Sequence, residues 1–211
     1  KPGSIRVGPY TQTGTREIDD LFGSEVIKFP KPTGLIEELV GVDLGTSDLP
    51  VVDYFAGSGT TGHAVVNLNR ADGGRRKYLL VEMGDYFETV LKPRLQKVIY
   101  SKDWKNGKPL SREGSSHLFK TLHLESYEDA LNNLELRRTS DQQDLLDKNA
   151  ELREDYMLRY QLDVETRDST SLLNLVQFAN PFAYQLKIAT GSAGESRPAT
   201  VDLVETFNWL L

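Results

Sequence analysis

The chain has 211 residues, 38% of them hydrophobic and 27% charged, which is the composition of a globular protein with one large or two small domains. It has no cysteine, so disulfides and thiolate metal sites are excluded, and its three histidines (His63, His117 and His123) lack the spacing of a zinc site, so we predict no metal. No apolar run is long enough to cross a bilayer, and the net charge of −6 argues against a broadly basic surface for nucleic acid.

The first 30 residues are rich in Gly, Thr and Pro and are predicted to be irregular, apart from a short helix over 17–22. Lys31-Pro32-Thr33 follows, where the proline fixes an extended approach and Thr33 can cap a helix. The apolar stripe of that helix consists of Leu35, Ile36, Leu39 and Val40. The start of this helix is therefore predicted to have a defined position.

A glycine turn is the most informative stretch of the chain. An apolar strand from Val51 to Phe55 ends at the small residues Ala56-Gly57-Ser58-Gly59, and a helix is predicted from Thr60 to a stop at Gly73-Gly74. Glycines permit positive φ and a close approach of the backbone to a ligand, and a helix start offers N–H groups without acceptors. The pattern predicts a ligand-binding turn.

Gly57, Gly59 and Gly62 have the spacing of a dinucleotide-binding motif, and Gly57 and Gly62 also have the outer spacing of a P-loop. The P-loop is disfavoured because His63 and Ala64 stand where Lys and Ser or Thr would hold phosphate and Mg²⁺. A dinucleotide site such as that for NAD stays open.

Two carboxylates bear on the choice of ligand. Glu82 ends the next apolar run, residues 78–82, where it would accept hydrogen bonds from a ribose diol. That run predicts a parallel strand buried on both faces. Asp53 would repel a pyrophosphate but suits a cationic sulfonium or amine. S-Adenosylmethionine carries both cations and no phosphate, so these residues favour it.

The region after Glu82 is predicted to be helical. Asp85-x-x-Glu88 has the pattern of a capping box, and Pro93 should kink or split the helix. Residues 100–108 place Lys102, Lys105 and Lys108 around Trp104. This run is typical of a solvated turn, with contact to DNA as the alternative.

The remaining residues show no catalytic constellation. They predict a weak strand over 119–124, a helix over 127–136, one helical apolar stripe over 145–160, a half-buried strand over 182–188, a turn over 191–195 and a helix over 201–211. The stripe is a packing face that could meet a partner subunit. Because the chain begins without Met and ends in an apolar helix, we expect it to be part of a longer polypeptide.

Several stretches, in this order, resemble the amino-methylating DNA methyltransferases, and in particular the Mod subunits of type III restriction-modification systems. They are Phe29-Pro30-Lys31-Pro32, Asp53-x-Phe55-Ala56-Gly57-Ser58-Gly59-Thr60-Thr61, Ser101-Lys102-Asp103-Trp104-Lys105, Glu125 to Leu134, and Val204-Glu205-Thr206-Phe207-Asn208. They are spread over nearly the whole chain.

The resemblance implies the C-terminal portion of a bacterial, cytoplasmic, site-specific DNA adenine-N6 methyltransferase that binds S-adenosylmethionine. The implied partners are double-stranded DNA, contacted mainly through parts outside this chain, a restriction (Res) subunit and a second Mod subunit. The implied fold is α/β: part of a Rossmann-like, doubly wound sheet, incomplete here, followed by a smaller α+β region. Its parts would be a connection over 1–30, a cofactor-binding part over 31–116 and a region for subunit contact over 117–211. The implied cofactor-binding residues are Lys31, Pro32, Thr33, Asp53, Phe55, Ala56, Gly57, Ser58, Gly59, Thr60, Thr61 and Glu82.

The Asp/Asn-Pro-Pro-Tyr/Phe motif with which this family holds the target base is absent before Asp53. Asn180-Pro181-Phe182 has one proline too few and lies after the glycine turn, so no catalytic residue is assigned. On this basis the chain alone should be inactive. A dinucleotide-binding oxidoreductase fragment and a non-catalytic subunit-interaction module remain the alternatives.

Overall fold

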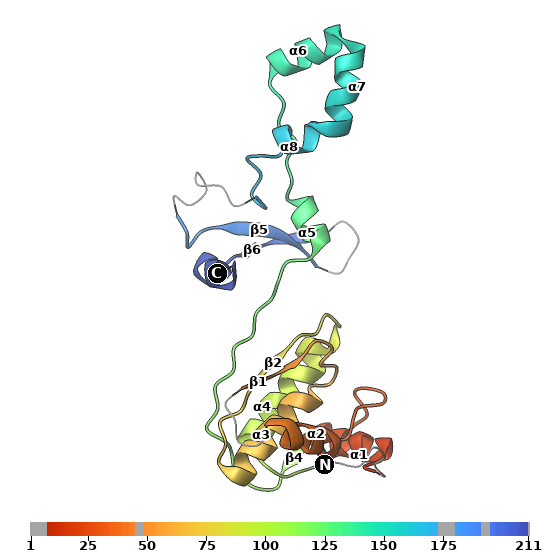
Figure 1. Cartoon of the computed structure of the whole chain (residues 1–211), viewed down its shortest axis with the longest axis vertical. Coiled ribbons are helices and arrows are strands. Elements are labelled where there is room, and N and C mark those ends of the chain that lie inside the picture. The colour runs from red at the N-terminus through yellow and green to blue at the C-terminus, as the bar shows by residue number, and fades with distance from the viewer. Residues whose placement is uncertain (1–7, 45–48, 173–179, 191–194, 211) are drawn as a thin grey trace. The chain divides into compact units, whose positions relative to one another are not determined.

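The computed structural model describes residues 8–44, 49–172, 180–190 and 195–210. The chain forms two compact units, residues 1–119 and 120–211, which are described separately (Figure 1). Both contain helices and small sheets, so the fold is mixed α/β as predicted. None of the helices within the described ranges is long and apolar enough to cross a membrane.

The first unit contains the glycine turn and most of the helices and strands predicted around it. Its helices are α1 (Thr11–Phe22), α2 (Thr33–Leu44), α3 (Thr60–Asp72), the π-helical turn η1 (Phe87–Leu91) and α4 (Lys92–Tyr100). Its strands are β1 (Pro50–Asp53), β2 (Lys77–Leu80), β3 (Trp104–Lys105) and β4 (Lys108–Pro109). α1 starts earlier than the short helix predicted over 17–22, α2 begins at Thr33, the residue predicted to cap it, and α3 begins at the predicted Thr60.

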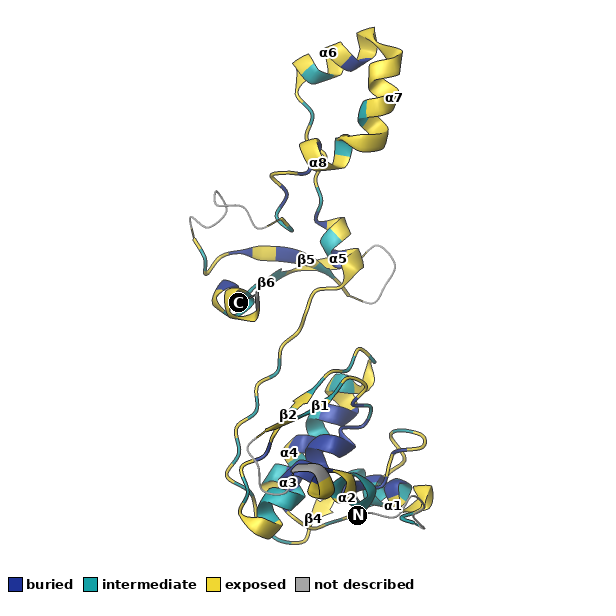
Figure 2. Ribbon diagram, viewed as in Figure 1, coloured by how far each residue is buried: buried dark blue, intermediate teal, exposed yellow. Residues whose placement is uncertain are grey.

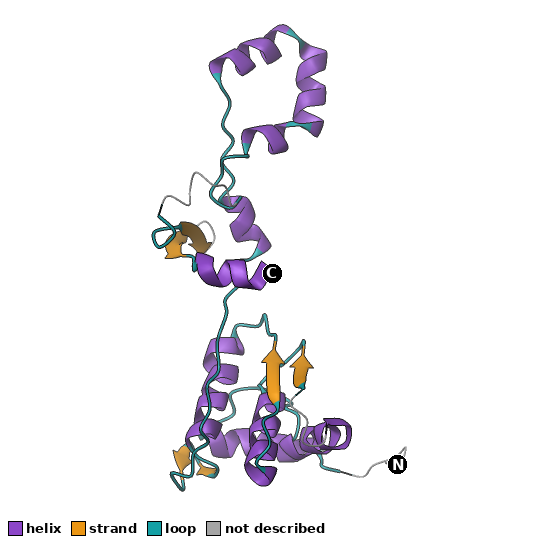
Figure 3. Ribbon diagram, turned by 60° about the vertical axis from the view of Figure 1, so that its left-hand side comes forward, coloured by secondary structure: helices purple, strands orange, loops and turns teal. Residues whose placement is uncertain are grey.

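β1 and β2 pair in parallel, from Pro50 opposite Lys77 to Asp53 opposite Leu80, with α3 as the connection between them. Figure 3 shows the two strands side by side. The prediction that the second strand is buried on both faces was wrong. Val52 and Leu79 point to an open face and are 42% and 47% exposed, because no described element covers them. Each sheet in the described ranges has two strands, so a Rossmann-like sheet is not seen.

α3 is the most buried helix of this unit, as its dark blue first turns in Figure 2 show. Every residue from Thr60 to Val66 is buried. Val66 packs with Leu21 and Val98 in one apolar cluster, and Leu91 and Leu95 pack with Ala56 in another. Through these contacts α1, α3 and α4 hold the glycine turn in place.

The π-helical turn η1 ends at Leu91 and α4 begins at Lys92, next to Pro93; Leu91 and Lys92 both have right-handed helical dihedrals, so the helix changes type there without the predicted split. The predicted capping box was wrong: Tyr86 is the residue before η1 and makes no side-chain cap. Farther on, β3 and β4 form an antiparallel hairpin whose turn residues Asn106 and Gly107 have φ of 47° and 76°. The turn predicted within residues 100–108 is confirmed, and an Asn-Gly pair suits such a hairpin turn.

The second unit differs more from the predictions. It contains α5 (Tyr127–Asn132), α6 (Ser140–Lys148), α7 (Ala150–Arg159), α8 (Gln161–Glu165), β5 (Gln185–Ala189), β6 (Ser196–Thr200) and α9 (Leu203–Leu210). The strand predicted over 119–124 is wrong, since these residues pair with no described strand. β6 was not predicted, and most of the turn predicted over 191–195 lies outside the described residues.

The single helical stripe predicted over 145–160 is interrupted at Asn149, whose side chain accepts a hydrogen bond from the Leu152 N–H and caps α7. Leu146 is buried, but Leu145 and Met157 are exposed. The core of this unit lies elsewhere, where Tyr184 and Leu186 pack against α9. The half-buried strand predicted there is confirmed as β5.

Candidate cofactor-binding site

The three glycines of the turn have different surroundings. Gly57 has a φ of 55°, and a β-carbon there would lie no closer than 3.9 Å to any other heavy atom, the Phe55 carbonyl oxygen. A β-carbon on Gly59 would lie 3.2 Å from Leu91 Cγ, and one on Gly62 would lie 2.7 Å from Leu95 Cδ2. Gly57 therefore leaves its backbone open to a ligand, while Gly59 and Gly62 allow close packing against η1 and α4.

Glu82 lies beside Gly57, as the crossover from β1 to β2 predicted. One carboxylate oxygen, Oε2, accepts the Gly57 N–H at 2.7 Å, and the other, Oε1, accepts the Gly84 N–H at 2.8 Å. Desolvation opposes ionisation, but these bonds and one from Tyr86 hold the pKa of the Glu82 carboxyl below its ordinary value. The carboxylate is thus ionised and fixed next to the open glycine.

Asp53, the last residue of β1, is held by two hydrogen bonds just before the turn. Its Oδ1 accepts the Phe55 N–H at 3.1 Å, and its Oδ2 accepts the hydroxyl of buried Thr61 at 2.5 Å. The Phe55 side chain itself is 88% exposed. The turn therefore carries two carboxylates and a free aromatic ring at the carboxyl ends of β1 and β2.

The Lys31–Thr33 turn lies against the same helix. The carbonyl of Lys31 accepts the Thr60 hydroxyl at 3.3 Å, and Pro32 is buried. The prediction that the Thr33 side chain caps the helix was wrong, because the Thr33 hydroxyl donates a hydrogen bond at this helix start, whereas a capping side chain accepts one from a helix N–H. Thr33 is the first residue of α2, and its N–H and hydroxyl both donate to Glu17 Oε2, at 2.9 and 2.5 Å. Glu17 of α1 is thus the acceptor at this helix start.

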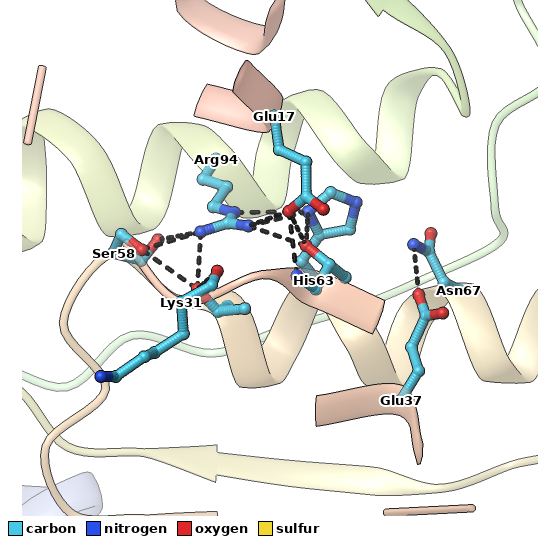
Figure 4. Close-up of polar contacts among 9 residues, drawn as sticks. Glu17, Lys31, Glu37, Ser58, His63, Asn67 and Arg94 are labelled. Atoms are coloured by element: carbon cyan, nitrogen blue, oxygen red, sulfur yellow. Dashed lines mark hydrogen bonds and ion pairs between the residues drawn. The ribbon is translucent and has the colours of Figure 1, made fainter. Parts of the chain in front are cut away.

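A buried arginine that the sequence reasoning missed connects these parts. Figure 4 shows the guanidinium of Arg94 among side chains from α1, α2, α3 and the glycine turn. Its Nη1 donates to Ser58 Oγ at 2.8 Å and to Thr60 Oγ1 at 2.9 Å, and its Nη2 donates to Thr33 Oγ1 at 3.1 Å. Burial lowers the pKa of Arg94 to about 10, so it remains a cation.

His63 completes this cluster. Its Nδ1 lies 3.3 Å from Arg94 Nε and 3.2 Å from Arg94 Nη2, which makes it an acceptor. Burial, followed by the charges of Arg94 and Arg70, places the pKa of His63 well below its ordinary value, so the ring is neutral. The described part of the chain holds no group of three or more side chains that could bind a metal.

The other motifs make contacts of their own. Lys105 forms an ion pair with Asp20, and the Lys97 ammonium lies 4.2 Å from the centre of the Trp104 ring. The Asn180-Pro181-Phe182 stretch is a turn before β5 in which Asn180 accepts the Phe182 N–H. The structure thus brings together the residues of the glycine turn, Lys31–Thr33 and Glu82.

Comparison with known proteins agrees with the motifs. The chain is 49% identical over 67 residues to the StyLTI Mod subunit, a type III restriction-modification enzyme of Salmonella typhimurium, and 42% identical over 84 residues to the EcoPI Mod subunit of Escherichia phage P1. It is also 44% identical over 73 residues to the type II methyltransferase M.KpnI of Klebsiella pneumoniae. No protein-family model matches the chain.

These matches are partial. They cover 32%, 39% and 35% of the chain, respectively, and only 10%, 13% and 17% of the relatives, so the chain spans a small part of their length. The matched stretches are also shorter than the span of the motifs. Within these stretches, the resemblance to Mod subunits and related DNA methyltransferases is confirmed.

Proposed function

We propose that this chain supplies the S-adenosylmethionine-binding part of a DNA methyltransferase, the modification subunit of a type III restriction-modification system acting on adenine N6. The observation that carries the proposal is the position of the ionised Glu82 carboxylate, 2.7 Å from the amide of the open Gly57. A carboxylate at the end of the second strand, beside a glycine turn, is the arrangement that holds a ribose diol. We infer that β1, α3 and β2 form one unit of a Rossmann-like sheet.

The residues present fit this cofactor. Around Gly57 there is room for a ligand to reach the backbone, and the first N–H groups of α3 have no acceptors within the helix. When bound, S-adenosylmethionine supplies a methyl group activated by its sulfonium charge. Glu82 would hold the ribose hydroxyls, Asp53 would face the cationic amine, and Phe55 offers an exposed ring to the base. Lys31–Thr33 would close the methionine end.

A dinucleotide fits less well, because Asp53 lies where a pyrophosphate would meet like charge. On the resemblance to Mod subunits, we further propose double-stranded DNA, contacted mainly through parts outside this chain, a restriction subunit and a second modification subunit as partners, and the bacterial cytoplasm as the location. The resemblance likewise carries the choice of adenine and the expectation that the chain alone is inactive, since the Asp/Asn-Pro-Pro-Tyr/Phe motif is absent.

Isothermal titration calorimetry of the full-length protein tests the proposal. Glu82→Gln and Asp53→Asn should each weaken S-adenosylmethionine binding about tenfold or more, because each removes a charged acceptor worth about 1.5–3 kcal/mol. Glu113→Gln is the control, since Glu113 is exposed on the segment after the β3–β4 hairpin. Absence of binding by the wild type, or unchanged affinity in both variants, would contradict the proposal. Saturable NAD binding that displaces S-adenosylmethionine would favour the oxidoreductase.

A further inference from the structure

The two walls of the proposed site come from distant parts of the sequence. The Lys31–Thr33 turn leads into α2, and the Ser58–Thr60 stretch leads into α3. One direct hydrogen bond, from the Thr60 hydroxyl to the Lys31 carbonyl, joins them at 3.3 Å. Farther along, His63 Nδ1 of α3 lies 3.5 Å from the Thr33 hydroxyl, and Asn67 of α3 donates to Glu37 of α2 at 2.8 Å. Arg94 adds a further connection, because its two terminal nitrogens bond to different walls. Nη1 contacts Ser58 and Thr60, and Nη2 contacts Thr33.

Arg94 is poorly placed for stability alone. It is 1% exposed, and its nearest carboxylate oxygen, Glu17 Oε2, is 3.8 Å from Nη2. Its close partners are neutral hydroxyls and the His63 ring. Arg76 offers the contrast: it is 4% exposed, and both of its terminal nitrogens bond to the two oxygens of Asp72, at 2.9 and 2.5 Å. A buried cation without a close carboxylate carries a desolvation cost that its Coulomb energy does not recover.

The geometry of the guanidinium suits it to connect the two walls. Its donors diverge in one rigid plane, so a single side chain can hold hydroxyls on both walls at a fixed separation. Glu17 extends the link, since it accepts from both the N–H and the hydroxyl of Thr33. His63 Nδ1 faces Nε, and the neutral ring can accept there. Each donor group of Arg94 thus points to an acceptor on the glycine turn, α3 or the start of α2.

We propose that Arg94 is a positioning residue that fixes the separation between the Lys31–Thr33 turn and the glycine turn, and thereby sets the affinity for S-adenosylmethionine. This inference rests on the proposed function. Arg94 is buried and bonds to both walls, so it acts through Thr33, Ser58 and Thr60. Lysine is not an adequate replacement, because one ammonium group cannot keep the divergent geometry of the fork.

The test compares Arg94 variants with Arg76→Met in the full-length protein, by calorimetry with S-adenosylmethionine and by thermal unfolding. Arg94→Lys should bind the cofactor about tenfold more weakly or worse, and Arg94→Met more weakly still. Arg76→Met removes an equally buried arginine away from the turn, so it should unfold at a lower temperature with unchanged affinity. Glu17→Gln keeps the shape of the side chain and should also weaken binding, which provides a variant of low folding risk.

The outcomes separate this inference from the proposed function. If the wild type does not bind S-adenosylmethionine, the proposed function fails and the positioning role fails with it. If the wild type binds, and folded Arg94→Lys and Glu17→Gln bind equally well, only the positioning role is overturned. A loss of affinity in Arg76→Met as large as in Arg94→Lys would also overturn it, because general destabilisation would then explain both. If the Arg94 variants do not fold, Glu17→Gln decides.

Discussion

The substitution Gly14→Ala in α1 has two opposite effects on stability, a gain from helix propensity and a loss from overpacking. Propensity alone predicts a gain of about 1 kcal/mol, because alanine is the better helix former. However, a β-carbon at Gly14 would lie 2.9 and 3.0 Å from the carbonyl carbon and oxygen of Lys31, and closer still to the Pro30 oxygen. A backbone oxygen cannot rotate away, so we place the cost near the upper end of the usual 1–3 kcal/mol for overpacking, about 3 kcal/mol. The expected result is a net loss of about 2 kcal/mol.

Urea unfolding, followed by the fluorescence of Trp104, measures this change. The chain has two tryptophans, and Trp104 packs beside the cluster that contains Leu21 of α1, so it reports on the first unit in a Trp209→Phe background. Gly41→Ala is the control, because a β-carbon there would meet nothing within 4 Å and should stabilise α2 by about 0.5–1 kcal/mol. Equal stabilisation by both substitutions would refute the packing argument at the Lys31–Thr33 turn.

Two further predictions concern polar contacts of residues that are not assigned to the candidate site. The hydrogen bond from Arg76 lowers the pKa of Asp72 to about 2, so its contribution is present above about pH 4 and is lost as the pH falls through about 2. Asp72→Asn should therefore flatten the acid dependence of stability, and an unchanged acid profile would contradict this. Asn133→Ala should destabilise the second unit by about 1–3 kcal/mol, because the Asn133 side chain bonds both the N–H and the carbonyl of Lys187 in β5, at 2.9 and 2.8 Å. The urea midpoint of the unfolding transition followed by Trp209 fluorescence, in a Trp104→Phe background, should be lower in this variant. An equal decrease in the midpoint followed by Trp104, in a Trp209→Phe background, would argue against separate units.

The sequence was most informative where short-range patterns decide the structure. The strand, the glycine turn and α3 follow from an apolar run, small residues and a stop at Gly73, which has a φ of 70° at the end of the helix. The parallel pairing of β1 with β2 then follows from the helical connection between them. The position of Glu82 beside Gly57 is a consequence of that topology.

Arg94 could not be assigned from the sequence, because its partners come from three separate segments, around Glu17, Thr33 and Ser58–His63. Its one local signal is its place on an apolar helical stripe. The stripe consists of Val90, Leu91, Leu95 and Val98. A charged residue within such a stripe is either buried or at the edge of the packed face, and periodicity does not distinguish the two. The distances from Arg94 to Ser58 and Thr33 show that it is buried.

The second unit shows where periodicity fails. The apolar positions from Leu145 to Tyr160 fit one helix, but Asn149 caps α7 with its own side chain and separates it from α6. The alternation over 119–124 resembles a strand, although a strand also needs a partner with matching register, which the sequence of one segment does not supply. Helices there are short and mostly exposed, so local patterns have little burial to restrain them.

The two amide donors on Glu82 have a thermodynamic consequence. A free glutamate side chain loses about 1.5–2 kcal/mol of rotamer entropy when it is immobilised. Here Gly57 and Gly84 each hold one carboxylate oxygen, so most of that entropy is lost when the chain folds. A ligand that donates hydroxyls to Glu82 therefore meets a group that is already ordered, and less of its interaction energy offsets ordering of the protein.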